Sequence, residues 1–333
     1  MGEYNIGQFI YRSRKAVGLT QEELCYNEFG EKCFSVETLS RIECGKQRPN
    51  YRTMHEIMRR LGKENCFCTP YLKTADYRVL EMKRRLKREI TLNNYSQAEN
   101  LLEQMEQELS LEYITNRQYL IRTHALIDQQ LGHISVEEAL ELMEEALKMT
   151  VHSYGTRLFS YEVLLPEEIV IVCNIASCYG KLKDTEKAIT LLQTVNNMLN
   201  DETLQFNSYP SGLREMVNRN LILWIGEEGK HREAIIECDR AIEECLKRDT
   251  LNTLPGLYYA RAYNMQKLRE NRSEYPDWRE DQMDGTEALL FTEPLYSMNE
   301  IKLDYIKCAL LAELVHDRKG SEKALSALKK IIS

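Results

Sequence analysis

The sequence predicts an all-α protein in which a small N-terminal helical unit is followed by a long array of helix pairs. Three observations predict this fold class. Helix-capping residues recur at short intervals in the first 50 residues, nearly no strand pattern occurs beyond Thr74, and two independent markers return about every 45 residues in the remainder. With 333 residues and 43% apolar content, the chain is large enough for more than one core.

The first two helices are predicted from their ends. An apolar i, i+4 repeat runs through a first helix that Gly18 ends. Thr20 follows as an N-cap, and Glu23 lies three residues on, where a capping box places its acidic partner. A second helix is therefore expected to begin at Gln21.

Ser35 predicts the start of a third helix, because its side chain can cap the residues that follow. Leu39 and Ile42 would point inward from that helix, which leaves a polar outer face. A helix start in the major groove of DNA can offer carboxylates to cytosine, methyl groups to thymine and guanidinium groups to guanine or phosphate. The side chains that supply these three groups are Glu37, Val36 or Thr38, and Arg41.

The segment resembles the Cro/phage-repressor type of helix-turn-helix. The matching residues are Gly18, Leu19, Thr20, Gln21, Glu22, Glu23, Leu24, Ser35, Thr38, Leu39, Ser40, Arg41, Ile42, Glu43, Gly45, Lys46 and Pro49. The resemblance implies a five-helix repressor-like domain in which Gln21 anchors a phosphate, Lys46 and Arg48 hold the DNA backbone, and Arg14 pairs with Glu43. It also implies that a set of side chains faces the bases: Ser35, Val36, Glu37, Thr38, Ser40 and Arg41.

Three features depart from that pattern. Residues 25–34 are about four residues longer than the usual turn, Cys44 replaces a common Asn, and Ser13 replaces a usual Leu. The longer turn leaves the angle between the second and third helices open. The alternative to a DNA reader is a small all-α domain whose capping residues serve folding alone.

Charge and cysteine content narrow the class of protein. Residues 1–62 hold 10 Lys and Arg against 8 Asp and Glu, whereas the rest holds 34 against 44. DNA affinity must then come from a few placed side chains and from dimerisation.

No long apolar run or signal pattern occurs, so we expect a cytoplasmic protein with no membrane partner. The 10 cysteines are scattered; reduced thiols are favoured over a metal site at Cys66 and Cys68, and Cys44 is a candidate redox-sensitive thiol.

The rest of the chain repeats. Five helices are expected to open with a small residue where two helices approach closely, at Ala98, Ala139, Ala188, Ala234 and Ala324. Prolines recur at similar intervals ahead of long helices, at Pro166, Pro210, Pro255 and Pro294. Two markers with one period predict a helical solenoid. The alanine positions resemble the second helix of tetratricopeptide repeats, although the aromatic signature of that family is incomplete.

The solenoid also suggests where a ligand could bind. Asn174, Asn220 and Asn264 recur at about the same position in successive first helices, and an asparagine amide can both donate to and accept from a peptide backbone. Lys181 and Arg219 could line the same surface and take a peptide carboxylate. A packing role for the asparagines, or chance, is the alternative. The basic run at residues 83–88 is predicted to be a solvated helix face, with a DNA-flanking contact as the other interpretation.

A repressor-like reader followed by a tetratricopeptide-like solenoid resembles the Rgg/PlcR-type peptide-pheromone regulators of Gram-positive bacteria. The resemblance implies a homodimeric cytoplasmic transcription regulator in quorum sensing, whose solenoid binds a short signalling peptide and controls operator binding. The expected domains are a reader at 1–65, a linker and connecting helix at 66–92 and repeats at 93–333. A solenoid that binds a protein partner instead of a peptide remains the alternative. No catalytic constellation or cofactor motif appears, so a non-enzyme without cofactors is expected.

Overall fold

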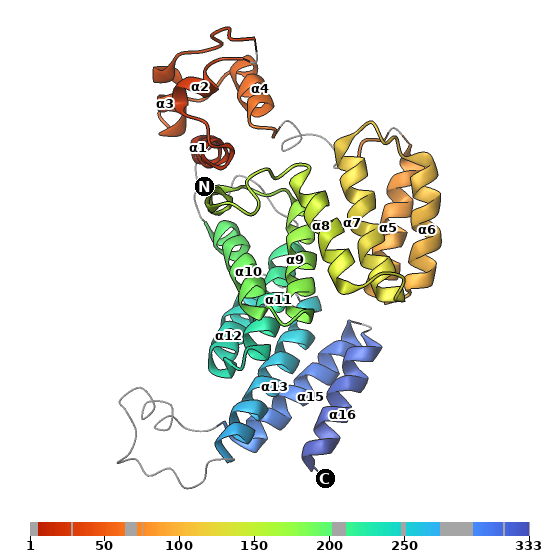
Figure 1. Cartoon of the computed structure of the whole chain (residues 1–333). Coiled ribbons are helices and arrows are strands. Elements are labelled where there is room, and N and C mark those ends of the chain that lie inside the picture. Colours follow the sequence, from red (N-terminus) through yellow and green to blue (C-terminus); the bar gives the residue numbers. More distant parts are fainter. Residues whose placement is uncertain are drawn as a thin grey trace, which may run out of the picture. The chain divides into compact units, whose positions relative to one another are not determined.

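The computed structural model describes residues 6–27, 29–63, 72–74, 76–201, 211–247, 251–273, 296–315 and 317–332. Within these ranges the chain is helical, and the one β-type pairing is an isolated bridge between Tyr26 and Lys32. The predicted all-α fold class is therefore confirmed (Figure 1). The chain divides into two units, residues 1–213 and 214–333.

The N-terminal segment of the first unit contains the expected helices. They are α1 (Ile6–Val17), α2 (Gln21–Leu24), α3 (Val36–Glu43) and α4 (Tyr51–Arg60). Thr20 and Glu23 form the predicted capping box, and Ser35 caps α3 by accepting from the backbone N–H of Thr38. Four helices lie in the described part of residues 6–63, so a fifth helix of the expected domain does not fall within it.

The core of this segment is small and tightly packed. Helices α1 and α3 approach so closely at Gly7 that a Cβ atom there would lie 2.0 Å from the carbonyl oxygen of Ile42. A side chain at this position would have to displace backbone, which a packed core resists. The fully buried apolar residues include Phe9, Ile10, Leu24, Leu39, Ile42 and Ile57.

The long turn between α2 and α3 has its own local order. The Tyr26–Lys32 bridge joins its two limbs, and the side-chain oxygen of Asn27 accepts from the backbone N–H groups of Phe29 and Glu31. The described residues of this longer turn are therefore held together by their own hydrogen bonds. The start of α3 is unaffected, because Ser35 supplies its own cap.

The repeat array begins earlier than the sequence predicts. Helix α5 (Tyr77–Thr91) shares a buried core with α6 (Tyr95–Glu108), in which Val79 and Leu86 contact Ala98 and its neighbours. The expected connecting helix is thus the first helix of the first pair. The array then continues with α7 (Ile114–Leu131), α8 (Val136–Lys148), α9 (Pro166–Lys181) and α10 (Thr185–Asn200).

Within residues 77–200, the first helices of the pairs lie on the concave side. Lys83 of α5 and Arg122 of α7 both pair with Glu167 at the start of α9. An ion pair from α5 to α9 reaches past α7, so the array must curve toward the face that α5, α7 and α9 form. This is the arrangement that an α-solenoid uses to present a binding surface.

The second unit is built in the same way. Its helices are α11 (Ser211–Glu227, from residue 214 onward), α12 (His231–Lys247), α13 (Leu254–Ser273), α15 (Met298–Leu314) and α16 (Arg318–Ile332). The short 3-10 helix η4 (Leu251–Thr253) precedes α13.

The five predicted alanines are fully buried, each in the second helix of a pair (Ala98, Ala139, Ala188, Ala234 and Ala324). Of the proline markers, Pro166 is the first residue of α9 and Pro255 the second of α13, whereas Pro210 and Pro294 lie outside the described residues.

A loop between α8 and α9 meets the N-terminal segment. It contains the 3-10 helix η2 (Arg157–Tyr161), which packs against α1. Arg12 of α1 donates to the carbonyl oxygen of Ser160 at 3.1 Å and also pairs with Asp201. Lys63, just after α4, is buried and donates to Glu162 at 2.6 Å and to the Val163 carbonyl at 3.0 Å.

Candidate nucleic-acid interface and ligand surfaces

Helix α3 presents a polar face outward and an apolar face inward. Leu39 and Ile42 are fully buried, whereas Glu37 and Arg41 are exposed on the other side. The remaining expected base-facing residues are half-buried: Ser35, Val36, Thr38 and Ser40. This helix can therefore offer a carboxylate, a guanidinium group, hydroxyls and methyl groups to one ligand without unfolding.

Capping at the start of α3 also prepares Glu37 as an acceptor. The pKa of Glu37 lies below its usual value, because its own backbone N–H and the Ser35 hydroxyl donate to the carboxylate. The side chain is ionised at neutral pH and can accept from donors such as the cytosine amino group. Ser35 thus contributes to the helix start and to the charge at it.

A buried network holds α1, α2 and α3 together. The guanidinium of Arg14 donates to both carboxylate oxygens of Glu43, at 2.7 and 2.9 Å, and to the Leu19 carbonyl at 2.9 Å. Both side chains of this ion pair are about 5% exposed. The side-chain amide of Gln21 donates to the same Glu43 at 2.7 Å. The pair that the resemblance implies is present, and Gln21, expected at a phosphate, is tied to it.

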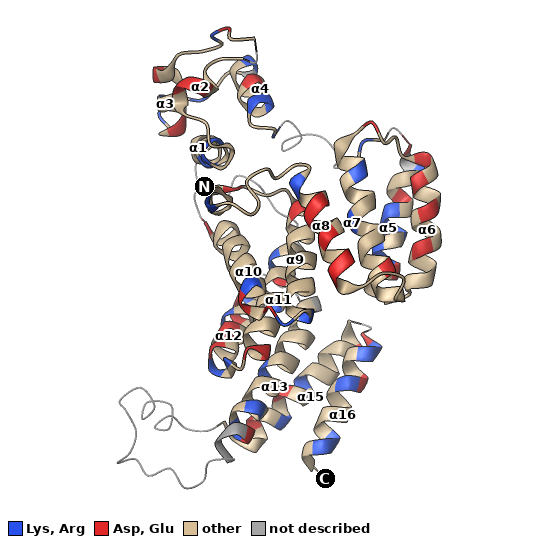
Figure 2. Cartoon of the chain, viewed as in Figure 1, with Lys and Arg blue, Asp and Glu red and all other residues tan. Residues whose placement is uncertain are grey.

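The chain just after α3 carries the two other expected DNA contacts. Gly45 takes a left-handed conformation with φ of 72°, and the backbone N–H of Lys46 donates to the Arg41 carbonyl at 2.8 Å. Lys46 and Arg48 are exposed on this turn, and Cys44 is exposed beside them. Figure 2 shows basic residues on α4 as well, whereas the charged residues of α6 and α8 are mostly acidic.

The three asparagines of the predicted ligand surface differ from one another. Asn174 on α9 is half-buried, and its amide nitrogen is enclosed without a hydrogen-bond partner among the described residues. Asn220 on α11 is half-buried too. Asn264 on α13 is 3% exposed; it accepts from His231 at 2.9 Å and donates to the Ala260 carbonyl at 2.8 Å. Asn264 therefore fits the alternative of a packing role, because its amide oxygen and nitrogen are both hydrogen-bonded within the protein.

The two basic residues expected near the asparagines are exposed on the same helices. Lys181 lies two turns after Asn174 on α9 and donates to the side chain of Gln129 at 2.7 Å. Arg219 directly precedes Asn220 on α11. Both can reach a ligand that contacts their helix.

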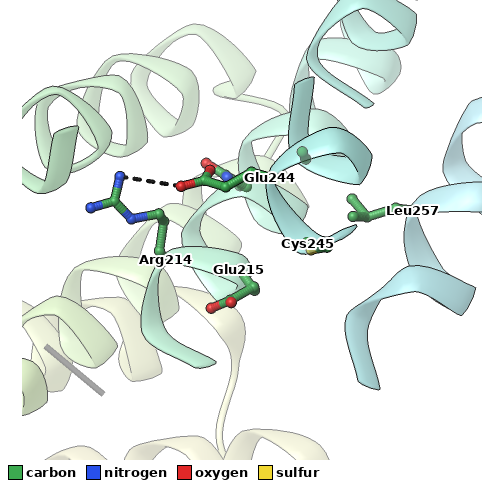
Figure 3. Close-up of a pocket in the computed structure, with 7 residues that line it drawn as sticks. Arg214, Glu215, Glu244, Cys245 and Leu257 are labelled. Atoms are coloured by element: carbon green, nitrogen blue, oxygen red, sulfur yellow. Dashed lines mark ion pairs between the residues drawn. The ribbon is translucent and has the colours of Figure 1, made fainter. Parts of the chain in front are cut away.

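Helix α11 also borders a small pocket with α12 and α13 (Figure 3). Arg214 and Glu244 pair across it at 3.6 Å, and Glu215 is buried with its Oε2 atom lacking a hydrogen-bond partner within the described ranges. The cavity has a volume of about 10 Å³, which matches one water molecule. It is too small for a peptide side chain.

One charged cluster on the concave face is absent from the sequence predictions. Lys83 and Arg122 flank the ring of Tyr119, each about 5.1 Å from its centroid, and both pair with Glu167. Burial raises the pKa of Glu167, but attraction to Arg122 and Lys83 outweighs burial and leaves the pKa below its usual value. The sequence pattern that relates to this cluster is the basic run at residues 83–88, which was predicted to be a solvated helix face. Lys83 is the residue of that run that pairs with Glu167 instead.

Candidate metal ligands are few in the described part of the chain. The eight cysteines there are free thiols, and Cys66 and Cys68 lie outside it. Glu99, Asp128 and His133 bring donor atoms within 4.8 Å of one another, as exposed and half-buried side chains at helix ends. Their 3.5 and 3.8 Å separations are those of ordinary surface ion pairs.

Comparison of the sequence with models of known protein families and with curated proteins gives no match. Solved structures do match. PlcR of Bacillus thuringiensis, in complex with the peptide PapR7 and DNA, is 18% identical with a TM-score of 0.58, over 97% of this chain and 99% of that one. The apo competence regulator ComR of Streptococcus vestibularis is 15% identical with a TM-score of 0.51, over 98% of both chains.

ComR of S. thermophilus, in complex with DNA and its signalling peptide ComS, is 17% identical with a TM-score of 0.50, over 98% of this chain and all of that one. At these identities the matches show the fold. The chain has the fold of PlcR and ComR along nearly its whole length, as the resemblance to Rgg/PlcR-type regulators implies.

Proposed function

We propose that this chain is a DNA-binding transcription regulator whose repeat array binds a short signalling peptide and thereby controls operator binding. The observation that carries the proposal is the outward polar face of α3, held on a repressor-like domain that precedes a solenoid. The fold it shares with a PlcR bound to peptide and DNA supports the same assignment. The chemistry is recognition, and no catalytic role is assigned.

Recognition of DNA would divide between two sets of residues. Glu37 and Arg41 reach bases from α3, together with the half-buried residues Ser35, Val36, Thr38 and Ser40. Lys46 and Arg48 contact phosphates from the turn that follows. One N–H of the Gln21 amide donates to Glu43; the second N–H of the same nitrogen would donate to a phosphate, or Gln21 would change partner at the DNA backbone.

Recognition of a peptide would use the first helices. Asn174 carries an enclosed amide nitrogen with no partner inside the described structure; if the half-buried side chain turns toward a bound peptide, a peptide carbonyl would satisfy it. Lys181 on α9 and Arg219 and Asn220 on α11 add exposed or half-exposed donors. Asn264 is omitted from the proposed surface, because its amide is internally bonded.

We further propose a cytoplasmic homodimer, since two readers can contact two half-sites and an operator then needs only a few phosphate contacts from each. No helix in the described residues combines the length and apolar content of a membrane crossing. Size measurement in solution and the symmetry of the selected operator would test the dimer.

Base reading by α3 can be tested with operators selected from random duplexes. Arg41→Ala should cost about 1–3 kcal/mol at one position of each half-site and relax the preference there. Lys46→Ala should weaken binding to selected and scrambled duplexes alike and lower the salt dependence by about one contact. Fluorescence anisotropy on both duplexes measures the two effects. Equal loss on both duplexes for Arg41→Ala would remove Arg41 from base recognition.

Peptide control can be tested through Asn220→Ala with a library of short peptides as the probe. A peptide that raises the melting temperature and changes operator affinity of the wild type should do so severalfold less well for the variant, since each backbone hydrogen bond contributes about 0.5–1.5 kcal/mol. The alternative is a repeat array that binds a folded protein. It would be favoured if no peptide in the library changes either quantity.

A further inference from the structure

A second candidate ligand site lies apart from the asparagines, where α8, α9 and α10 meet the loop that contains η2. This pocket has a volume of about 380 Å³, enough for a bulky organic molecule the size of one large amino acid. Its main lining residues are Glu144, Lys148, Tyr154, Phe159, Tyr179 and Lys187. None of them belongs to the proposed DNA or peptide contacts.

The carboxylate in the pocket is already satisfied. Glu144 accepts hydrogen bonds from the hydroxyls of Tyr179 at 2.6 Å and Tyr154 at 2.9 Å. Burial raises the pKa of Glu144, but these hydroxyl donors together with Lys148 outweigh it, so that the pKa is below its usual value. Burial and the bond to Glu144 raise the pKa of Tyr179 to about 12. Burial and the Glu144 carboxylate raise the pKa of Tyr154 as well, so both tyrosines stay neutral and fix the wall of the pocket.

The two ammonium groups are available to a ligand. Lys187 lies 4.6 Å from the ring centroid of Tyr179, and Lys148 lies 5.7 Å from that of Tyr154. Their nearest carboxylates, on Asp184 and Glu144, are 3.4 and 3.5 Å away, and both lysine side chains are more than half exposed. Such exposed pairs contribute little, so an incoming anion can share the lysines at small cost.

The rest of the lining suits an apolar or aromatic body. Phe159 meets the ring of Tyr154 edge to face at a centroid distance of 5.5 Å, and Leu191 closes the apolar side. Rings that are held in this way offer large contact area at low entropic cost. The rim carries two exposed lysines, each with one carboxylate neighbour, and the rings lie within, an arrangement that suits an anion attached to a bulky apolar group.

We propose that this pocket is a second effector site for a small organic carboxylate with an aromatic or bulky apolar body, whose occupancy alters operator affinity through η2. The carboxylate would lie between Lys148 and Lys187, and the body would lie against Tyr154, Phe159 and Leu191. A free acid and the carboxyl terminus of a peptide share this chemistry.

A short series of contacts links the pocket to α1 of the N-terminal segment. Thr156 lines the pocket and caps η2 by accepting from the backbone N–H of Leu158. Two residues later Ser160 accepts from Arg12 of α1, and a Cβ atom on Gly18 would contact the Leu158 side chain at 3.5 Å. A ligand that moves Thr156 or Phe159 therefore moves the surface on which α1 rests. This coupling, unlike the binding itself, rests on the DNA-binding function proposed above.

N-acetyl-phenylalanine is a suitable probe, and its amide, N-acetylphenylalaninamide, is the uncharged control. We expect calorimetry on the full chain to detect the acid and to give at least tenfold weaker binding for the amide, because the amide lacks the charge that the lysines recognise. Lys187→Gln should weaken binding of the acid about fivefold, and the double change Lys148→Gln, Lys187→Gln should abolish it. N-acetyl-triglycyl-phenylalanine distinguishes the two sources of the carboxylate: if it binds more tightly than the single residue, a peptide terminus is the occupant.

Lys323→Gln is the matched control, because Lys323 lies 4.4 Å from the ring centroid of Tyr259 but lines none of the pocket. It should bind the acid as the wild type does. Equal binding of acid and amide, or unchanged binding by the double variant, would overturn the site. Saturating acid should shift operator affinity at least twofold in the wild type and not in the double variant. Binding without such a shift would overturn the coupling through η2.

Discussion

Helix α3 and the asparagine series of the repeats were both predicted to bind ligands because of their polar residues, yet the two sets of side chains differ in the structure. All the side chains expected to face the bases lie exposed or half-buried on one short segment, residues 35–41. Among the asparagines, Asn174 has an unpartnered amide nitrogen within the described residues, whereas Asn264 is buried and bonded to His231. The same residue type at the same period thus lies in two different environments.

The difference comes from the distance over which each pattern must hold. The outward face of α3 is set within eight residues by a cap at Ser35 and two buried side chains, Leu39 and Ile42. The asparagine series depends on several helix pairs having identical rotation and spacing. Solenoid repeats vary in both, so a surface position in one pair can be an interface position in another.

The largest expected effect on stability concerns the buried ion pair of Arg14 and Glu43, which supports α3. Arg14→Ala or Glu43→Ala should each destabilise the N-terminal segment by about 3–5 kcal/mol, because the remaining charge is buried without its partner. The double change should cost less than the sum of the two. Native-state hydrogen exchange of α1 and α3 amides in the full chain measures this. Additive costs would show that the two side chains do not interact.

Arg78→Ala is the control for that pair. Arg78 also has a close carboxylate partner, Asp76 at 2.6 Å, but its side chain is 78% exposed. Solvent screens such a pair, so its loss should leave the exchange rates of α1 and α3 unchanged.

A smaller effect should separate the asparagines from one another. Asn264→Ala should destabilise the second unit by about 1–3 kcal/mol, because the buried His231 ring nitrogen loses its partner. Asn174→Ala should be neutral or slightly stabilising without ligand, since it removes an enclosed donor that has no partner among the described residues. Melting temperatures of the two variants without ligand test this difference in stability. Equal destabilisation would mean that Asn174 is a packing residue as well.

The smallest effect concerns the concave cluster around Glu167. Because the pKa of Glu167 in the folded state is lowered, its contribution to stability is present above the unfolded pKa of about 4.3 and is lost as pH falls through the folded value. Glu167→Gln should cost about 1 kcal/mol at pH 7, because the amide oxygen can still accept from Lys83 and Arg122 but no longer attracts their charges, and the difference from wild type should vanish at low pH. Urea unfolding between pH 7 and 3 tests this. A difference that grows on acidification would reverse the assigned sign.

Much of the fold was accessible to sequence reasoning because its signals are local. Thr20 and Ser35 cap the helices that they were expected to cap, and the five repeat alanines are fully buried. The first helix pair was missed because α5 precedes the first repeat marker, so its partnership with α6 appears only in the packed core. Glu167 was missed for a related reason, since its partners lie 45 and 84 residues away.

The pocket at Tyr154 and Tyr179 shows the same limit. Its lining comes from three helices and a loop, and no spacing in the sequence relates Lys148 to Lys187. Gly7 is a further case, because its need for a small residue arises from the carbonyl oxygen of Ile42 on another helix. The base-facing and peptide-facing assignments remain predictions that the proposed binding experiments address.

The buried ammonium of Lys63 has a practical consequence for dividing the molecule. Lys63 belongs to the N-terminal segment by sequence, yet it is enclosed by Glu162 and Val163, and Glu162 also accepts from Ser153 at 2.5 Å. A repeat domain cut at the expected boundary near residue 66 would keep this carboxylate and lose its only described cation. Such a fragment would carry a defect of its own, so its ligand affinity would not represent that of the intact chain. Dissection should retain Lys63, or replace Glu162 with Gln, before the halves are compared.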